Sequence, residues 1–341
     1  MDLPERFESA EHLEDVMTTP SAALVADLER VPGDIIVLGA GGKMGPTLAR
    51  LAKRAAPDRR VVAVARFSEP GVRASLERHG VECVQADLLD RDARARLPQV
   101  ANVVFMAGRK FGSTGAEPLT WAMNVHVPAL VAEAFKGSRI VVFSTACVYP
   151  FVAVAGGGAT EDTPPTPPPG EYASSCVGRE RMFQHFSALH GTPGRLIRLS
   201  YAIDMRYGVL HDVARKVLAR EPIDLATGHV NVIWQGDANS QALRALAHCT
   251  TPSSALNVSG AEPTSIRALA AAFGERFGVE PVLTGRESAA AWLVNTDAAQ
   301  ALFGRPDVSL ATMIGWTADW VGHGGASLGK DTHYEVRDGN Y

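Results

Sequence analysis

Six short apolar runs recur along the first two hundred residues, and a segment with helical spacing separates each run from the next. The runs are DIIVLG (34–39), RRVVAVA (59–65), VECVQA (81–86), NVVFMA (102–107), RIVVFS (139–144) and GRLIRLS (194–200). Their length and continuous apolar character are typical of strands that are buried on both faces. Strands that alternate with helices in this way predict an α/β fold, a doubly wound parallel sheet with helices on both faces.

The rest of the chain divides into parts that differ in pattern. Residues 1–33 look like a helical extension that ends at a proline-glycine pair, and residues 34–200 hold the six runs. Residues 201–323 lack the alternation. Their helical spacing predicts a smaller, mostly helical C-terminal lobe that binds substrate and either shares strands with the main sheet or stands apart from it. Residues 324–341 are polar and rich in glycine, so we expect a terminal tail or arm.

Proline and glycine crowd residues 150–171, which excludes a helix or a central strand there. The segment joins the end of a strand to the start of a helix, and ligands bind beyond the carboxyl ends of the strands in such sheets. Two interpretations stay open: a plain exposed loop, or a cover over the site, which we favour.

Charge and cysteine content exclude several classes of protein. The chain has 33 Lys and Arg against 37 Asp and Glu, a net charge of -4, which argues against a nucleic-acid partner. Four scattered cysteines show neither a C-x-x-C pair nor metal-ligand spacing, so we expect no metal site and a reduced compartment. The N-terminus has no apolar signal segment and no window is long enough to span a bilayer. We therefore expect a cytoplasmic protein without membrane association.

The sequence GAGGKMG (39–45) follows the first apolar run and opens a helix. Its G-x-x-G-x-x-G spacing in this context indicates a dinucleotide-binding domain of the Rossmann type. The glycines permit a tight turn and a close approach of backbone to a pyrophosphate, whose charge the helix N-terminus favours. A plain glycine turn is the alternative. The residues of this loop expected to bind the cofactor are Gly39, Gly42, Lys43, Met44 and Gly45.

Arg66 ends the second run, where an acidic residue would hold both ribose hydroxyls of NAD. Arginine suits a 2'-phosphate, and Lys43 adds positive charge nearby, so NAD or NADP is expected with a slight lean to NADP. The alternative is that Arg66 stacks on the adenine or faces solvent. Asp87 and Leu88 follow the third run, and Asp87 is expected to accept a hydrogen bond from the adenine amino group.

From about Asp34 to Trp320 the chain resembles the extended short-chain dehydrogenase/reductase family, the NAD-dependent epimerase/dehydratase group. The resemblance is carried by the glycine loop and by FMAGRK, WAMNV, FSTACVYP, NVSGAEPTSIRALAAAFGE and VNTDAAQALFGRP. It implies an NAD(P)-dependent epimerase, dehydratase or oxidoreductase that acts on a sugar, sugar acid or nucleotide sugar. It also implies a homodimer, formed through the helices at about 117–136 and 172–190.

The same resemblance assigns roles to residues outside the glycine loop. It implies that Thr145 hydrogen-bonds the reacting oxygen of the substrate and that Tyr172 acts as the acid/base. The further cofactor contacts that it implies are Met106, Ala107, Gly108, Asn124, Ser144, Tyr172 and Tyr201. The substrate contacts expected are Arg109, Thr145, Tyr149, Asp204 and Arg206, with simple packing as an equal alternative for Tyr149.

The stretch EYASSCVGRE (171–180) departs from the Y-x-x-x-K motif of the family, because Cys176 stands where the lysine belongs. That lysine would hold the nicotinamide ribose and favour the phenolate, which a neutral thiol cannot do. Bringing the pKa of a tyrosine from roughly 10 to 7 takes about 4 kcal/mol. Glu180 nevertheless supports the register of the motif.

Three interpretations of this departure stay open. The cationic role has moved to Lys110, Arg179 or Arg109, which makes Lys110 a catalytic candidate beside Tyr172, Thr145 and Cys176. Alternatively, the chemistry does not need a fast phenolate. Last, the protein is a catalytically silent dinucleotide-binding regulatory or interaction protein on the same fold.

Three residue types receive structural assignments from the sequence. Arg198, on an apolar run, is expected to pair structurally, and Asp237 is expected to be structural. The tryptophans Trp292, Trp316 and Trp320 are expected in the core of the smaller lobe.

Overall fold

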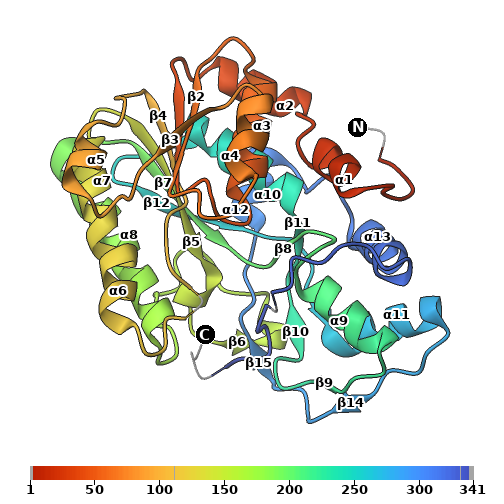
Figure 1. Ribbon diagram of the computed structural model, residues 1–341. Coiled ribbons are helices and arrows are strands. Elements are labelled where there is room, and N and C mark those ends of the chain that lie inside the picture. The colour runs from red at the N-terminus through yellow and green to blue at the C-terminus, as the bar shows by residue number, and fades with distance from the viewer. Residues whose placement is uncertain (1–2, 111, 331, 338–341) are drawn as a thin grey trace.

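A seven-stranded sheet forms the centre of the computed structural model, which describes residues 3–110, 112–330 and 332–337 (Figure 1). The strand order is β12-β7-β5-β4-β1-β2-β3, and every pairing in this sheet is parallel. Its strands are β1 (Ile35–Leu38), β2 (Val61–Ala65), β3 (Glu82–Gln85), β4 (Asn102–Phe105), β5 (Arg139–Thr145), β7 (Gly194–Leu199) and β12 (Ser254–Val258). The predicted α/β class with a doubly wound parallel sheet is confirmed.

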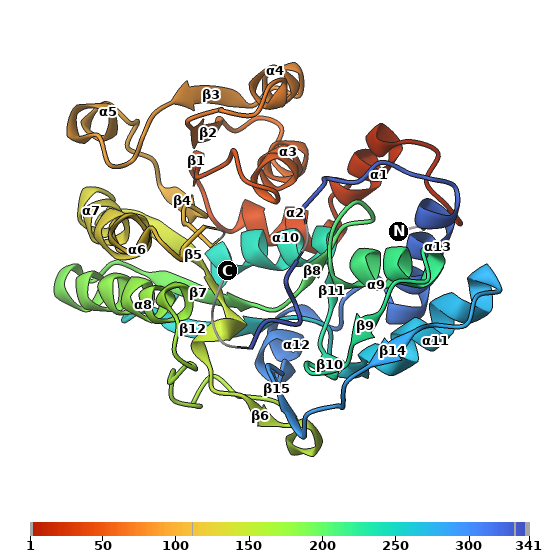
Figure 2. The same ribbon diagram turned by 60° about the horizontal axis from the view of Figure 1, so that its bottom comes forward.

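Helices cover both faces of the sheet, as Figure 2 shows. Helices α2 (Ala22–Glu29), α3 (Gly45–Ala55) and α10 (Gln235–Arg244) pack on one face, and α7 (Val127–Ala134) and α8 (Glu171–His190) on the other. Alternate residues of β1 divide between the two cores, because successive side chains of a strand point to opposite faces. Ile35 and Val37 pack towards α3, while Ile36 and Leu38 pack towards α7 and α8.

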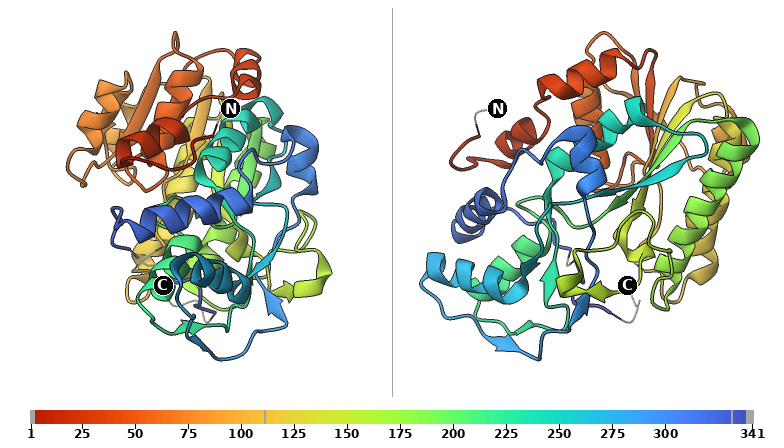
Figure 3. Two further views of the ribbon diagram at one scale, coloured as in Figure 1. Left: turned by 90° about the vertical axis from the view of Figure 1, so that its right-hand side faces the viewer. Right: turned by 180° about the vertical axis from the view of Figure 1, so that it is seen from behind.

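Beyond residue 200 the chain adds one strand and two helices to the sheet domain and otherwise builds a lobe beside it (Figure 3). The strand is β12, and the helices are α10 and α12 (Asp297–Phe303), so the second half of the chain shares a strand with the main sheet. The lobe contains α9 (Val209–Leu218), α11 (Ile266–Phe277), α13 (Leu310–Gly322) and the short strands β8 (Ala202–Ile203), β9 (Ile223–Asp224), β10 (His229–Val230), β11 (Ile233–Trp234), β13 (Thr264–Ser265), β14 (Leu283–Thr284) and β15 (Ala290–Ala291).

The N-terminal extension is helical and ties the lobe to the sheet domain. Helix α1 (Ala10–Met17) is followed by α2, and the segment before α1 inserts Phe7 into the lobe core. The ring of Phe7 lies 4.8 Å from that of Trp316, and Trp316 lies 5.3 Å from Trp234. Trp316 and Trp320 are therefore core residues, as predicted.

Short elements complete the described fold. They are α4 (Val72–Arg78), α5 (Arg91–Ala95), α6 (Glu117–Trp121), the π-helical η1 (Ala122–His126), the 3-10 turns η2 (Ala146–Val148), η3 (Val154–Gly156) and η4 (Ala245–His248), and β6 (Val152–Ala153). Across the described residues, no helix combines the length and the apolar character needed to cross a membrane.

The C-terminal tail packs against the lobe instead of projecting as an arm. The backbone N–H of Leu328 donates to the carbonyl of Arg206 at 3.0 Å, and the side chains of Ser327 and His211 hydrogen-bond at 3.2 Å. Tyr334 is only 2% exposed and belongs to the lobe core. Of the expected tail, residues 331 and 338–341 lie outside the described part.

Candidate functional site

The glycine loop between β1 and α3 has a backbone that only glycine permits at two positions. Gly39 has φ +91, and a Cβ added there would lie 2.4 Å from the backbone nitrogen of Ala107. A Cβ at Gly45 would lie 2.5 Å from the carbonyl oxygen of Ala40. The loop therefore folds tightly against the end of β4 and leaves the N-terminus of α3 open to a ligand, which fits the pyrophosphate of a dinucleotide.

Two cavities meet at this loop, and Gly39, Gly42 and Met106 line both. The larger cavity has a volume of about 310 Å³ and the smaller one about 230 Å³. Further residues of the larger cavity that the sequence predicted are Lys43, Met44, Gly45, Lys110, Ser144, Thr145, Tyr172 and Tyr201. Those of the smaller cavity are Arg66, Asp87, Leu88, Ala107 and Gly108. The carboxyl ends of six strands, β1 to β5 and β7, thus bring most of the predicted site together.

Lys43 does not line the same cavity as Arg66, contrary to the expectation that it adds positive charge near Arg66. Arg66 lines the smaller cavity and Lys43 the larger one. The Lys43 ammonium donates to the carbonyl of Ala202 at 3.2 Å and lies 3.9 Å from the ring centroid of Tyr207. Burial lowers the pKa of Lys43 to about 7, although the carboxylate of Asp204 opposes the shift.

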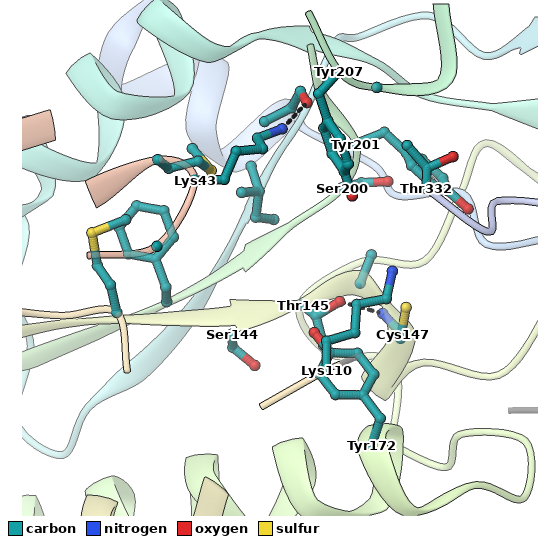
Figure 4. A pocket seen from close by; sticks show the side chains of 18 of the residues that line it. Lys43, Lys110, Ser144, Thr145, Cys147, Tyr172, Ser200, Tyr201, Tyr207 and Thr332 are labelled. Atoms are coloured by element: carbon teal, nitrogen blue, oxygen red, sulfur yellow. Dashed lines mark hydrogen bonds between the residues drawn. The ribbon is translucent and has the colours of Figure 1, made fainter. Parts of the chain in front are cut away.

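Tyr172 and Thr145 face each other in the larger cavity (Figure 4). Tyr172 lies at the start of α8 and Thr145 at the end of β5, and their side chains hydrogen-bond. The Thr145 hydroxyl also accepts from the backbone nitrogen of Cys147 at 3.2 Å. Burial raises the pKa of Tyr172 well above its ordinary value, and the Cys176 and Cys147 thiols add to this shift. The tyrosine is therefore protonated at neutral pH unless a cation favours its phenolate.

Cys176 does not line either cavity, so its candidacy as a catalytic residue is not supported by its position. Its side chain is fully buried in a small cluster with Val148, Tyr149 and Val294. Burial raises the pKa of Cys176 to about 11, so the thiol carries no charge near neutral pH. The residue is a packing residue one helical turn behind Tyr172.

Of the three cations named as replacements for the missing lysine, Lys110 alone lines the larger cavity. Its ammonium lies 5.9 Å from the ring centroid of Tyr172. Arg179 is buried beneath the site and donates to the carbonyl of Phe143 at 2.8 Å. Arg109 folds back on the carbonyl of Gly112, also at 2.8 Å. Lys110 is therefore the one of the three that shares the cavity with Tyr172, while the charge of Arg179 lowers the pKa of Tyr172 from beneath the site.

Asn124, predicted to bind the cofactor, instead holds the loop after β4 in place. It is fully buried on η1 and lines neither cavity. Its side-chain oxygen accepts from the backbone nitrogen of Arg109 at 2.8 Å and from Arg179 at 2.8 Å, and its nitrogen donates to Ser175 at 2.9 Å. Asn124 therefore fixes the backbone beside Lys110 and so positions this part of the site.

The four side chains of Arg109, Tyr149, Asp204 and Arg206, all predicted to touch substrate, line neither cavity. The Tyr149 hydroxyl donates to Asn257 at 2.8 Å, so packing is the correct one of its two interpretations. Asp204 and Arg206 form an ion pair at 2.8 Å. Both residues follow β7 and lie near the site, but the side chain of each is paired with that of the other.

Arg198, expected to pair structurally, does so with Glu180. The guanidinium donates to both carboxylate oxygens, at 3.0 and 2.7 Å, and both side chains are buried. Ser144 donates to the same carboxylate at 2.6 Å. This network joins β5, β7 and α8 directly below the larger cavity.

The sequence analysis missed six polar or aromatic residues of the larger cavity: Phe143, Cys147, Ser200, Tyr207, Trp292 and Thr332. Ser200 and Tyr207 follow β7, a position that already pointed to Tyr201. Trp292 was assigned to the lobe core, but it lines the cavity and its indole donates to the carbonyl of Tyr149 at 2.9 Å. Nothing in the sequence marked Thr332, which comes from the tail.

The segment 150–171 does not cover this cavity. Tyr172 lines the larger cavity, but the residues from 150 to 171 line neither cavity. The segment packs instead on the far side: β6 pairs with β15, and Glu161 accepts from the backbone nitrogen of Asn257 at 2.8 Å. The interpretation as a cover is therefore wrong.

The fold and the site define a dinucleotide-binding protein of the Rossmann type, with a tyrosine and a threonine facing each other beside the glycine loop. Residues 35–249 match the family described as NAD dependent epimerase/dehydratase. The chain belongs to this family, which confirms the resemblance and the expected class of NAD-dependent enzyme. A comparison with curated protein sequences found no significant match.

Solved structures of such enzymes share the fold. The UDP-glucuronic acid 4-epimerase of Bacillus cereus in complex with NAD superposes with a TM-score of 0.72 at 19% identity, covering 85% of this chain and 99% of the epimerase. For the UDP-glucose 4-epimerase of Thermus thermophilus with NAD the TM-score is 0.68 at 22% identity, covering 84% and 98%. This chain therefore carries segments that those proteins lack.

Proposed function

We propose that the protein is an NAD(P)-dependent epimerase, dehydratase or oxidoreductase of a sugar, sugar acid or nucleotide sugar, in which Lys110 takes over the electrostatic role of the missing lysine. The observation that carries the proposal is the meeting of Tyr172, Thr145 and Lys110 in one cavity beside the glycine loop. Tyr172 lies on α8, Thr145 at the end of β5 and Lys110 on the loop after β4, so their meeting is a property of the fold.

A nicotinamide dinucleotide fits the two cavities. The adenosine end belongs in the smaller cavity with Arg66 and Asp87, the pyrophosphate at the N-terminus of α3, and the nicotinamide end in the larger cavity. Bound there, the cofactor supplies the acceptor or donor of a hydride. Arg66 supports a lean to NADP, because a guanidinium matches a 2'-phosphate, whereas Lys43 no longer adds to that argument.

The protein's own groups then move the proton. Thr145 orients the reacting oxygen, and Tyr172 removes or returns its proton. The Lys110 ammonium lies 5.9 Å from the centroid of the Tyr172 ring, so its charge favours the phenolate. It acts against the burial that raises the pKa of Tyr172.

The charge of the larger cavity favours an acidic substrate. Lys43 and Lys110 both line it, and among the described residues its lining includes neither Asp nor Glu. The charge of these ammonium groups attracts anions. This favours a substrate with a carboxylate or a phosphate, a sugar acid or a nucleotide sugar, over a neutral sugar.

The test begins with the dinucleotide that co-purifies with the protein and continues with turnover on a panel of sugar acids and nucleotide sugars. We expect Tyr172→Phe to lower kcat by at least about 100-fold while dinucleotide affinity stays within about threefold, because only the proton-transfer step is lost. Absence of binding to either NAD or NADP would overturn the proposal.

A catalytically silent dinucleotide-binding protein is the second candidate, and the raised pKa of Tyr172 is the observation that favours it. A silent protein should bind the dinucleotide tightly and turn over no member of the panel. The variant Tyr172→Phe should then lose no dinucleotide affinity. Turnover that depends on Tyr172 separates the two functions.

A further inference from the structure

We propose that Lys43 binds the diphosphate of the dinucleotide through its ammonium group, and that the protein takes up a proton at Lys43 when the dinucleotide binds. The inference rests on the proposed function, because it takes the ligand of the glycine loop to be a nicotinamide dinucleotide. It replaces the expected place of Lys43 near a 2'-phosphate with a place at the diphosphate, and it makes dinucleotide affinity depend on pH.

Lys43 belongs to the loop that fits the diphosphate. It directly precedes Met44, the N-cap residue of α3, and it lines the larger cavity together with Gly42 and Gly45. The side chain of Met44 makes no capping hydrogen bond, and the first turn of α3 contains no acidic residue. The N–H groups of this helix N-terminus therefore favour an anion, and the lysine adds a full positive charge to their partial charges.

The partners of the Lys43 ammonium are neutral. They are the carbonyl of Ala202, at 3.2 Å, and the ring of Tyr207, whose centroid lies 3.9 Å away. Among the described residues, no carboxylate forms an ion pair with this half-buried ammonium. Figure 4 shows Lys43 and Lys110 extending from opposite sides of the cavity. An anionic ligand on the glycine loop would therefore supply the counter-ion that Lys43 lacks.

Asp204 lies close enough to influence Lys43, but its carboxylate is already paired. The side chain of Arg206 donates to both of its oxygens, at 3.0 and 2.8 Å, and the backbone nitrogen of Arg206 donates at 2.9 Å. Glu14 on α1 accepts from the same guanidinium at 2.7 Å. The N-terminal extension thus fixes this ion pair from behind, and the Lys43 ammonium is left to a ligand.

The protonation of Lys43 is balanced near neutral pH in the free protein. Burial lowers its pKa to about 7. The carboxylates of Asp204 and Asp212 oppose this shift of the pKa. The charges of Lys110 and Arg206 add to it. A bound diphosphate brings negative charge to the ammonium and raises the pKa again, so binding is accompanied by proton uptake from the solvent.

The pH dependence of binding follows from these two states. The free site loses its proton as the pH rises through about 7, whereas the occupied site keeps it, so binding weakens above neutral pH. The uptake per dinucleotide should be about 0.1 proton at pH 6, about 0.5 at pH 7 and about 0.9 at pH 8. The dissociation constant should rise about fivefold from pH 7 to pH 8, but less than about twofold from pH 6 to pH 7.

Calorimetry in buffers of different ionisation enthalpy measures this uptake, with NADH, NADPH and ADP-ribose as probes. ADP-ribose has the diphosphate without the nicotinamide and should give the same uptake. Lys43→Arg keeps the charge but cannot release its proton, so it should bind without this uptake and with an affinity at pH 6 within about threefold of wild type. Lys43→Met should bind about tenfold more weakly at pH 6, again without this uptake. The matched control is Lys136→Met, which alters an exposed lysine that lines neither cavity and should behave as wild type.

Three results would overturn the inference. The first is an equal proton uptake in wild type and Lys43→Arg, even if the protein is an active enzyme. The second is a Lys43-dependent uptake that appears only when glucuronic acid is added, because this probe has an anionic group but no diphosphate and would assign Lys43 to the substrate. The third is the absence of binding to either dinucleotide, which would overturn the proposed function as well.

A second readout uses the protein without cofactor. Acetic anhydride acylates only the neutral amine of a lysine, and peptide mass spectrometry follows the reaction at each lysine separately. The rate at Lys43 should be half-maximal near pH 7, whereas the rate at an ordinary exposed lysine still rises at pH 9. ADP-ribose should slow the reaction at Lys43 and leave the rate at Lys136 unchanged. A rate at Lys43 that rises through pH 9, or that ADP-ribose does not lower, would contradict the inference whether or not the protein turns over a substrate.

Discussion

At the scale of single residues, the proposed cationic partner of Tyr172 in the cavity lies on the loop after β4. Cys176 occupies the helical position as a buried neutral thiol, while the Lys110 ammonium lies 5.9 Å from the centroid of the Tyr172 ring. Asn124 holds the backbone that carries Lys110. The chemistry of the site therefore depends on a loop whose position is fixed by a buried amide.

Lys110→Met tests this arrangement directly. Loss of this electrostatic support should lower kcat/KM by on the order of 100-fold and move the acid limb of the pH profile to higher pH, because the phenolate is harder to form. Arg109→Ala is the matched control, since Arg109 contacts Gly112 and should change kcat/KM by less than about threefold. Equal losses in both variants, or none in Lys110→Met, would contradict the assignment.

The variant Cys176→Lys tests whether the active site without the helical lysine is a rebuilt site or a degraded one. We expect it to lower both turnover and the unfolding midpoint, because it adds a second buried ammonium near Lys110 and several kcal/mol of desolvation cost. Cys176→Ala should keep most of the turnover and cost about 1 kcal/mol through a small cavity. A large gain of activity in Cys176→Lys would instead indicate a degraded enzyme.

At the scale of elements, α10 carries a carboxyl group that burial keeps from ionising easily. Asp237 lies in the first turn of α10, and its carboxylate accepts from the backbone nitrogen of Val308 at 3.0 Å. Burial raises the pKa of Asp237 to about 7, although that hydrogen bond opposes the shift. The residue is structural, as the sequence predicted, and it joins α10 to the segment before α13.

This raised pKa makes stability depend on pH. The folded protein binds the proton of Asp237 more tightly than the unfolded chain, so the free energy of unfolding falls as the pH rises from about 4 to about 7. Asp237→Asn cannot ionise and should exceed wild type in stability above pH 7 by on the order of 1 to 4 kcal/mol, with no gain below pH 4. Urea titrations at several pH values measure this. The exposed Asp58→Asn serves as control, and a pH-independent difference for Asp237→Asn would contradict the prediction.

At the scale of the whole molecule, α6 and α8 form one outer face with large exposed apolar side chains. Leu119 and Trp121 on α6 are 43% and 41% exposed, and Leu189 on α8 is 62% exposed. An outer face with such residues is typical of a protein interaction site. It coincides with the helices through which the family resemblance implied a homodimer.

We therefore expect a homodimer in solution, formed through this face. Leu119→Glu/Leu189→Glu should convert it to a monomer without changing the unfolding midpoint measured at high dilution, because both side chains are exposed within one chain. Light scattering coupled to gel filtration measures the mass. Leu218→Glu, which alters a residue 41% exposed on α9, should remain dimeric, and a monomeric wild type would contradict the expectation.

The sequence by itself determined the order of strands and helices, the glycine loop, and the places of Tyr172 and Thr145. Each of these follows from contiguous residues: apolar runs that must be buried, and glycines that a close backbone contact requires. Only the tertiary structure decided that Lys110 lines the cavity with Tyr172 while Arg179 lies beneath it, that Tyr149, Asp204 and Arg206 have partners elsewhere, and that Thr332 lines the cavity. These facts depend on packing between segments far apart in the chain. Several partners are available there to each polar group, and the local sequence does not indicate which of them forms the hydrogen bond.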